Sequence, residues 1–516
     1  MLKYGIKEDM GERINMERKK KIAIGMIMLG VFLSSCTSTQ IKEEPGIDIV
    51  IEDVRPVEKP EQPKEIIIPQ IPAEKPAIEK FAESKIMKYG NVSFYAVDLE
   101  SGETVESYRE NTGLVPASVM KIVTSAAALE VMGGEKTFKT KLVYDGSINS
   151  EGVLQGDLYI IGGGDPTLGS DGIEKNPTAF IYQWLNEMKK LGIKSVTGDL
   201  IVMDGKFGYE GVPGKWLWED MGTSYAQGTY GISIFDNLYS LHLKSGGAGT
   251  KPEIVSVKPE IKGMTFDNQA RVSDRRKISV RGVPFENKRT IIGVVPQNSN
   301  IVLKSDIPDP GLFMGQYFAD AMKNVGITLK GKITTERVSS KKAAAPKTIA
   351  VTESVTVEEM VKVLLERSDN HYTEHLFQLL KSDYNTDIEK FWKSKGIDVS
   401  ALIMRDGSGL SRGDILSAKI LVDILVYMDN NTDLQFSQLL PVTGEKGTVA
   451  DFMKETGITA RVKSGSMSGI QSYTGYLEKD GKRYAFAIIV NHWNGSRNQL
   501  KREMEKLLIE LVNKNI

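Results

Sequence analysis

Runs of β-branched and aromatic residues near the start of the patterned region predict a β-hairpin. Two such runs, residues 92–97 and 104–108, flank a polar turn at residues 98–102. We therefore expect the folded part of the chain to begin just before the hairpin, near Ser84.

A helix and a long β-rich region follow the hairpin. Residues 122–132 are mostly apolar or small and have no helix breaker before Gly133, which predicts a helix with a glycine stop. From residue 139 to residue 340, short β-rich runs alternate with turn signals. One helix interrupts them, at residues 177–190, with apolar positions at helical spacing. This region predicts one or two inserted, mainly β domains.

Helical spacing is the main pattern of the C-terminal part, which follows a linker at residues 343–347. The predicted helices are residues 355–367, a segment that runs through Leu380, 417–428 and 499–512. Residues 473–477 and 484–491 predict an antiparallel pair of strands. We therefore expect an α/β fold in which helices flank an antiparallel sheet.

The N-terminal segment has the pattern of a secretion signal. Basic residues at positions 18–21 precede an apolar run at residues 22–33. About twelve apolar residues are too few to cross a bilayer, which takes roughly twenty, so we interpret residues 1–36 as a signal peptide. The residues that end at Cys36 resemble a bacterial lipobox, which implies cleavage before Cys36 and lipid attachment to it. An ordinary signal peptide with an incidental cysteine is the alternative.

The next segment is rich in proline. Seven of the nineteen prolines lie between residues 37 and 82, interleaved with Glu and Lys and almost no aromatic residues. This composition is typical of an extended chain. We expect residues 37–83 to form a tether.

Composition narrows the classes of function. The chain has 516 residues, of which 41% are hydrophobic and 26% charged, as in globular proteins of two to four domains. A net charge of −1 favours neither nucleic acid nor an anionic membrane surface as the partner. The single cysteine, Cys36, excludes an intrachain disulfide and a cysteine-based metal cluster.

Ser118 and Lys121 lie three residues apart at the start of the first predicted helix. This spacing places the hydroxyl beside a possible proton acceptor, and the N-terminus of a helix favours developing negative charge. By itself the pair is weak evidence, because a serine at a helix start is more often only a cap.

Two distant motifs change this interpretation. In order along the chain, the motifs are Ser118-x-x-Lys121, Ser368-Asp369-Asn370 and Lys463-Ser464-Gly465. This order is typical of penicillin-recognising serine enzymes, and the three motifs together are far more specific than any one of them.

Each residue type has a use in acyl transfer. Lys121 with a lowered pKa can take the proton of Ser118, and Ser368 can relay it toward a leaving amine. Lys463 offers positive charge to a substrate carboxylate. The amide of Asn370 offers both a donor and an acceptor to a substrate amide.

With these motifs, the chain resembles the D-alanyl-D-alanine carboxypeptidases/endopeptidases among the low-molecular-mass class C penicillin-binding proteins, over about residues 85–516. Residues 162–168 and 406–411 also match motifs of this family. Ser118 and Ser368 lie 250 positions apart, which leaves room for the inserted domains that the family has.

The resemblance implies a penicillin-binding/β-lactamase-like transpeptidase domain, an antiparallel sheet flanked by helices. This catalytic domain would comprise residues 84–138 and 345–516. Residues 139–344 would form the inserted, mainly β domains.

The resemblance also implies a function. The chain would be a serine DD-peptidase that cleaves the terminal D-Ala-D-Ala bond of peptidoglycan stem peptides through an acyl-enzyme, with β-lactams as covalent inhibitors. Cleavage of cross-links by the same enzyme is left open. The implied catalytic residues are Ser118, Lys121, Ser368, Asn370 and Lys463. No cofactor or metal is implied. The enzyme would act in the cell envelope, facing the periplasm or the cell exterior, held by the lipid on Cys36.

The third motif is expected to lie on a strand edge beside the substrate. Ser464, Gly465 and Ser466 would contact the substrate, and the backbone N–H groups of Ser118 and Ser466 would form an oxyanion hole. The family usually has threonine at position 464. Serine keeps the hydroxyl and loses the stiffer rotamer of threonine, so the chemistry should survive.

Asp165, Arg412 and Met467 lie in or beside family motifs and suggest a specificity site. Asp165 and Arg412 could bind the ammonium and carboxylate at the end of a diaminopimelate side chain, with Met467 packed on its methylenes. The alternative is that Asp165 only caps a turn and Arg412 is structural.

Two rival functions remain open. Residues 371–375 match the zinc-peptidase signature H-x-x-E-H, with His371 and His375 on one helix face, although no third ligand can be singled out. The other rival is a catalytically silent cell-wall-binding protein of the same fold.

Overall fold

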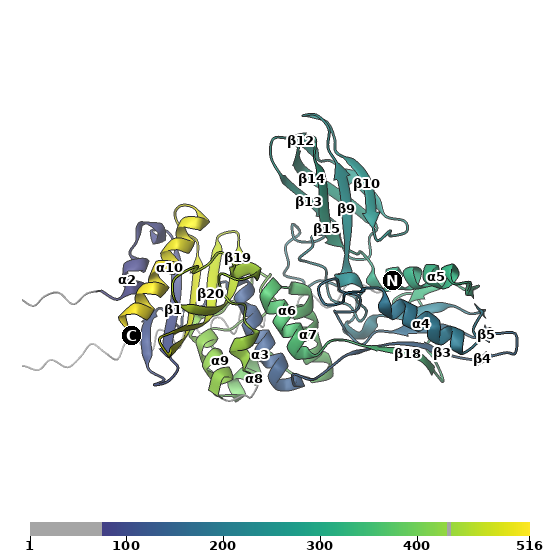
Figure 1. Cartoon of the computed structure of the whole chain (residues 1–516), viewed down its shortest axis with the longest axis horizontal. Helices are drawn as coiled ribbons and strands as arrows, with labels where there is room; N and C mark the ends of the chain where they lie inside the picture. The colour runs from purple at the N-terminus through teal and green to yellow at the C-terminus, as the bar shows by residue number, and fades with distance from the viewer. Residues whose placement is uncertain (1–74, 431–434, 516) are drawn as a thin grey trace, which may run out of the picture. The chain divides into compact units, whose positions relative to one another are not determined.

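The computed structural model describes residues 75–430 and 435–515 (Figure 1). The expected signal peptide, Cys36 and residues 37–74 of the expected tether lie outside these described residues. Within them, no helix combines the length and the hydropathy that crossing a bilayer requires.

A five-stranded antiparallel sheet forms the centre of the catalytic part, in the order β19-β20-β21-β1-β2. Its strands are β1 (Asn91–Asp98), β2 (Thr104–Tyr108), β19 (Thr459–Met467), β20 (Ile470–Lys479) and β21 (Lys482–Asn491). The predicted hairpin and the predicted antiparallel pair are both confirmed. The third motif lies on β19, which is an edge strand as expected.

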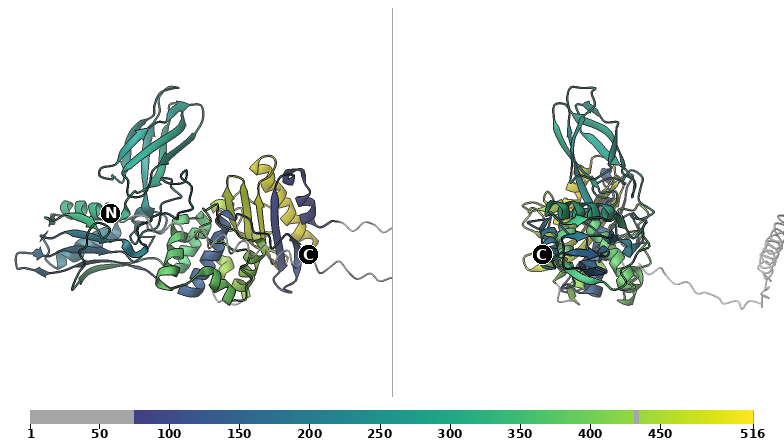
Figure 2. Two further views of the ribbon diagram at one scale, coloured as in Figure 1. Left: turned by 180° about the vertical axis from the view of Figure 1, so that it is seen from behind. Right: turned by 90° about the vertical axis from the view of Figure 1, so that its right-hand side faces the viewer.

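Both faces of this sheet are buried, as alternation along β21 shows. Ala487 and Ile489 point into a core shared with α3 (Met120–Met132) and α9 (Ala418–Asn430). Phe486, Ile488 and Val490 point into the opposite core, beneath α10 (Arg497–Lys514) (Figures 1 and 2). Because successive side chains of a strand face opposite sides, one strand can serve two cores.

The expected tether, residues 37–83, overlaps the first helix of the fold. The short helix α2 (Ala77–Ala82) packs against α10, with Ile78 and Phe81 buried in the same core. The carboxylate of Glu106 accepts hydrogen bonds from the backbone N–H groups at the start of α2. The fold therefore begins before Ser84.

The other helices of the catalytic part pack around α3. They are α6 (Val357–Arg367), α7 (Asn370–Asp383) and α8 (Ile388–Ser394). The short 3₁₀ helices are η1 (Lys85–Met87), η2 (Ala117–Val119), η3 (Gly205–Phe207), η4 (Phe235–Asn237), η5 (Phe436–Leu439) and η6 (Gly447–Val449). The sequence pattern predicted α6, α7 and α9 but missed α8.

Residues between α3 and α6 form four further sheets. The first has the order β17-β8-β6-β3-β18 and the second the order β16-β7-β5-β4. Their strands are β3 (Lys139–Tyr144), β4 (Ser147–Ile148), β5 (Val153–Gln155), β6 (Leu158–Ile161), β7 (Ser195–Val196), β8 (Leu200–Met203), β16 (Thr328–Leu329), β17 (Ile333–Thr335) and β18 (Lys347–Glu353). Two helices, α4 (Ala179–Lys190) and α5 (Pro310–Asn324), share their core.

The remaining two sheets have the orders β10-β9-β15 and β11-β14-β12, with β13 also paired to β14. Their strands are β9 (Leu238–Lys244), β10 (Glu253–Lys258), β11 (Thr265–Asn268), β12 (Arg271–Ser273), β13 (Lys277–Arg281), β14 (Lys288–Pro296) and β15 (Asn300–Asp306).

The boundary expected at residue 344 is also corrected. β18 pairs with β3, the first strand after α3, so the inserted sheet continues to Glu353. Residues 75 onwards belong to one compact unit, and we keep the division into a catalytic and an inserted part as a proposal.

Candidate active site

Ser118 lies in η2, immediately before α3. The preceding residue, Ala117, has a φ of 53°, in the left-handed region that non-glycine residues rarely adopt. Such backbone conformations persist where the surrounding structure holds them, and they cluster at functional sites. The predicted position of Ser118 at the start of a helix is confirmed.

The amine of Lys121 lies beside the hydroxyl of Ser118. Lys121 Nζ is 3.0 Å from Ser118 Oγ, 2.6 Å from Asn370 Oδ1 and 2.8 Å from the carbonyl oxygen of Ser408. Burial lowers the pKa of the Lys121 amine to about 8, although nearby carboxylates, of which Asp406 is the strongest, oppose the shift. A lysine with this pKa can accept a proton near neutral pH.

Buried carboxylates shape the loop that faces Lys121. Glu374 Oε1 accepts the backbone N–H groups of Gly407 (3.0 Å) and Ser408 (2.7 Å). Asp406 accepts the N–H of Gly409 at 2.6 Å. These bonds hold the carbonyl of Ser408 toward Lys121.

The second motif joins two helices. Ser368 ends α6 with a φ of 59°, and Asp369 caps α7 by accepting the N–H of Tyr372 at 3.0 Å. Asn370, the first residue of α7, accepts from Lys121 and donates through Nδ2 to the carbonyl of Tyr225 at 2.8 Å. The amide of Asn370 therefore links the lysine to a segment of the inserted part.

Lys463 is more deeply buried than its expected role requires. Its Nζ donates to Ser368 Oγ at 2.9 Å and to the carbonyl of Ser464 at 2.7 Å. Burial, helped by the charge of Lys121, lowers the pKa of Lys463 well below its usual value. This geometry fits a lysine that positions Ser368, whereas we had expected direct pairing with a substrate carboxylate.

Gly465 allows β19 to approach the nucleophile. A Cβ atom at this position would lie 2.7 Å from the carbonyl oxygen of Pro116 and 3.1 Å from the nitrogen of Ser118. A larger residue would push the strand away from Ser118. Ser464, next to it, donates from its hydroxyl to Thr448 Oγ1 at 2.8 Å.

A cavity of about 400 Å³ opens over these groups. Its lining includes Ser118, Ser368, Asn370, Gly409, Leu410, Arg412, Ser466, Met467, Ser468, Leu217, Glu219, Asp220 and Tyr225. The structure thus brings all three motifs together, as predicted, with Lys121 and Lys463 buried behind the cavity surface.

Asp165 does not belong to this cavity. Its side chain is buried, and Oδ1 accepts hydrogen bonds from the backbone N–H and the hydroxyl of Thr167, both at 2.7 Å. Burial raises the pKa of this carboxyl to about 6. Its position therefore does not support the expected contact of Asp165 with the substrate, and the turn-capping alternative describes the contacts of Oδ1.

Arg412 and Met467 do line the cavity, and the sequence did not identify the acidic residues that share it. Arg412 is exposed and donates to the carbonyl of Ser468 at 3.3 Å. Glu219 and Asp220 come from an irregular segment of the inserted part. No periodicity or motif marks that segment, so only the long-range fold reveals it.

His371, Glu374 and His375 of the H-x-x-E-H motif make hydrogen bonds to other groups of the protein. His375 Nε2 is 3.0 Å from Ser233 Oγ, and His371 Nδ1 is 3.2 Å from the carbonyl of Gly228. Burial lowers the pKa of His371 to about 4. Glu374 binds the loop that faces Lys121. Among residues 75–430 and 435–515, no three or more His, Cys, Asp or Glu are placed to hold a metal ion.

Comparison with known proteins identifies a family. A family model described as the D-Ala-D-Ala carboxypeptidase 3 (S13) family matches residues 75–511. The chain is 27% identical over 425 residues to a D-alanyl-D-alanine carboxypeptidase from an Actinomadura species, covering 77% of each chain. It is 23% identical over 432 residues to D-alanyl-D-alanine carboxypeptidase DacB from Haemophilus influenzae, covering 80% of this chain and 87% of the relative.

Solved structures show the same fold. Penicillin binding protein 4 from Haemophilus influenzae gives a TM-score of 0.71 at 22% identity, covering 85% of this chain and 98% of the other. The same protein in complex with a β-lactam gives a TM-score of 0.68 at 21% identity over the same shares. The predicted α/β fold, an antiparallel sheet flanked by helices, is confirmed.

Proposed function

The chain belongs to the D-Ala-D-Ala carboxypeptidase 3 (S13) family, and we propose that Ser118 is the nucleophile through which it cleaves D-Ala-D-Ala peptides. It is a serine-type D-Ala-D-Ala carboxypeptidase, one of the low-molecular-mass class C penicillin-binding proteins. One observation carries the proposal. The buried amine of Lys121 lies 3.0 Å from Ser118 Oγ, within hydrogen-bond distance of the proton that it must accept.

The proposed reaction is an acyl transfer in two steps. Ser118 Oγ attacks the carbonyl carbon of the penultimate D-Ala while its proton passes to Lys121. The peptide C–N bond breaks, and the amine of the terminal D-Ala leaves after receiving a proton through Ser368. A water molecule then adds to the ester and releases Ser118 and the shortened peptide.

Two backbone N–H groups are proposed to stabilise the oxyanion. They belong to Ser118 and Ser466, which line the same cavity. Removing one such donor in other enzymes has slowed catalysis by roughly 10²–10³-fold, so their placement matters as much as the nucleophile. The close fit of Gly465 against the nitrogen of Ser118 supports this pairing.

Peptidoglycan stem peptides are the substrate class, and β-lactams act as covalent inhibitors because their strained amide is attacked in the same way.

The silent wall-binding protein and the zinc peptidase are not favoured. The former has no need for Lys121 and Lys463 to be buried against serine hydroxyls. Incubating the protein with a peptide that ends in D-Ala-D-Ala should release free D-Ala, and absence of release would overturn the proposal.

We propose a revised specificity site that pairs Arg412 and Met467 with Asp220 in place of Asp165. Arg412 would bind a carboxylate and Asp220 an ammonium at the end of the diamino-acid side chain. All three residues line the catalytic cavity.

Arg412→Ala should raise KM about tenfold for a peptide whose diamino-acid side chain ends in a free carboxylate, because one charged hydrogen bond is lost. The same variant should leave KM unchanged for a peptide amidated at that end. Steady-state kinetics on the peptide pair checks this, and equal discrimination by wild type and variant would contradict it.

We propose that the enzyme acts in the cell envelope and is anchored by a lipid on Cys36. The basic, apolar and small residues that precede Cys36 support this. Cys36→Ala should move most of the protein from the membrane fraction to the soluble fraction, since the lipid cannot attach. Unchanged fractionation, measured by immunoblot of the expressed full chain, would exclude the anchor.

A further inference from the structure

A second cavity lies on the inserted part. It has a volume of about 480 Å³. Its lining comprises Trp218, Arg281, Gly282, Val283, Glu286, Lys288, Thr290 and Ile292, from β13, β14, the loop between them and the segment before Asp220. No residue of the three motifs lines it, so the catalytic reaction does not account for it.

The two cavities share one stretch of chain. Leu217 and Glu219 line the catalytic cavity, while Trp218 between them lines the second. Burial raises the pKa of Tyr225, which also lines the catalytic cavity, and the nearby positive charge of Arg281 partly opposes this shift. Neighbouring residues of one segment therefore line both cavities.

Trp218 is the most conspicuous side chain of the second cavity. Its side chain is 62% exposed, although tryptophan is highly buried on average in folded proteins. The face of an indole ring carries negative charge density, which attracts the polarised C–H bonds of a flat partner. An exposed tryptophan beside a cavity is therefore suited to stacking against a sugar ring.

Two cations complete the polar side of the cavity. Arg281 is half-buried and Lys288 is exposed, and within the part of the chain that the structure describes neither side chain is hydrogen-bonded or ion-paired. Glu286 is the carboxylate of the lining. Arg281 and Lys288 can donate hydrogen bonds to hydroxyl, acetamido and carboxylate oxygens.

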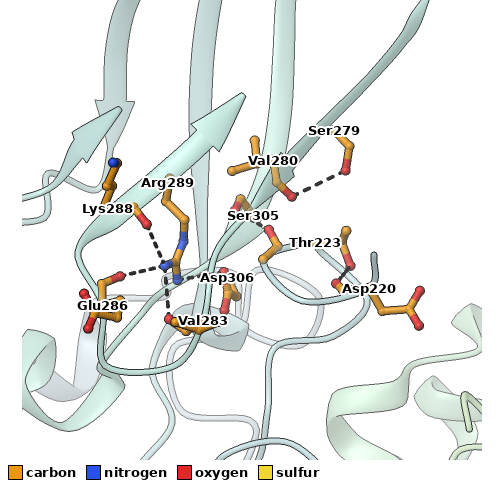
Figure 3. A network of polar contacts seen from close by, with 11 residues as sticks. Asp220, Thr223, Ser279, Val280, Val283, Glu286, Lys288, Arg289, Ser305 and Asp306 are labelled. Carbon is orange, nitrogen blue, oxygen red and sulfur yellow. Dashed lines mark hydrogen bonds and ion pairs between the residues drawn. The ribbon is translucent and has the colours of Figure 1, made fainter. Parts of the chain in front are cut away.

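A buried ion pair lies behind the loop that joins β13 and β14. Arg289 and Asp306 are fully buried and lie 3.0 Å apart (Figure 3). Arg289 Nη1 also donates to the carbonyls of Glu286 (2.6 Å) and Val283 (3.2 Å). Burying a charge pair is costly, and here it fixes the loop that carries three of the eight lining residues.

The segment that carries Trp218 is hydrogen-bonded to β15 and to the loop between β13 and β14. Ser305 Oγ donates to the carbonyl of Gly222 at 2.5 Å, and the N–H of Gly282 donates to the carbonyl of Met221 at 3.3 Å. Hydrogen bonds therefore fix both the loop between β13 and β14 and the segment that carries Trp218. Binding sites held in this way lose less entropy when a ligand binds.

We propose that the second cavity binds the saccharide to which the stem peptide of the substrate is attached. One sugar ring would stack on Trp218, and its hydroxyl and acetamido oxygens would accept hydrogen bonds from Arg281 and Lys288. This inference rests on the proposed function, because it takes the peptide end of the same molecule to lie at Ser118. In this proposal, the inserted part recognises the sugar portion of the substrate.

The experiment compares a free pentapeptide that ends in D-Ala-D-Ala with the same peptide joined to its disaccharide. For the wild type, kcat/KM should be about tenfold higher for the glycosylated substrate, as expected for one stacked ring with its hydrogen bonds. Trp218→Ala should remove this preference and leave kcat/KM for the free peptide unchanged. Tyr182→Ala, which removes a 59% exposed aromatic side chain on α4, is the matched control and should keep the preference.

Two results would overturn the inference. One is a wild type without preference for the glycosylated peptide, and the other is a Trp218→Ala variant that retains it. Calorimetric titration of the Ser118→Ala protein with the disaccharide alone separates this inference from the proposed function. Binding that is lost on adding Trp218→Ala supports the sugar site even if neither peptide is cleaved, and absence of binding counts against it.

Discussion

Ser118→Ala is expected to lower the rate of D-Ala release by roughly 10⁴-fold or more, because the acyl-enzyme can no longer form. The protein should still fold, since the change removes one oxygen atom at the edge of a cavity. Product release from a D-Ala-D-Ala peptide, followed by chromatography, measures the effect.

Ser125 provides the matched control for this prediction. It lies on α3, the helix that follows Ser118, and its buried hydroxyl has no hydrogen-bond partner among the described residues. Ser125→Ala should therefore leave both activity and thermal stability nearly unchanged. If Ser118→Ala retained activity comparable to that of Ser125→Ala, Ser118 would not be the nucleophile.

Lys121→Met is expected to lower kcat/KM by roughly 10³-fold, because the thioether fills the space but cannot accept the proton of Ser118. In the wild type, kcat/KM should rise with pH through about 8, where the buried amine loses its proton. The value of kcat/KM rises with pH because the free amine of Lys121, which accepts the proton, accumulates above its pKa. A pH–rate profile of the wild type and of Lys121→Met checks both statements.

Glu374→Gln tests the electrostatic part of this prediction. The charges that face Lys121 are Asp406, Glu374, Asp369 and Asp414, which raise its pKa. Burial raises the pKa of Glu374 to about 8, so its carboxyl group is about half ionised where Lys121 titrates, and part of its charge acts on the amine. Glu374→Gln can keep the two hydrogen bonds to the loop while removing that charge, and the midpoint of the profile should move to lower pH. An unmoved midpoint would show that a group other than Lys121 sets it.

The three motifs could be found from the sequence because each depends on local spacing. Ser118 and Lys121 come together through one turn of helix, and Ser368 and Asn370 through the junction of α6 and α7. Their assembly into one site then followed from the family resemblance. The burial of Lys463 could not be predicted, because it depends on how the edge strand β19 packs against the end of α6.

The errors share a physical cause, which is that tertiary contacts override local signals. The sequence analysis did not predict α5, in which a Cβ at Gly311 would collide with the carboxylate of Asp204 and a Cβ at Gly315 would lie 2.8 Å from a methyl of Ile333. Close packing thus requires both glycines. Asp165 looked functional because its motif is distinctive, whereas Asp220, which lines the cavity, has no motif.

The most direct test of the central claim is to locate the acyl group. The full chain would be incubated with a labelled penicillin, digested with a protease and mapped by mass spectrometry. If Ser118 is the nucleophile, we expect one adduct, on Ser118, in the peptide that also holds the Ser118-x-x-Lys121 motif. An adduct on another residue, or none under conditions in which D-Ala is released, would contradict it.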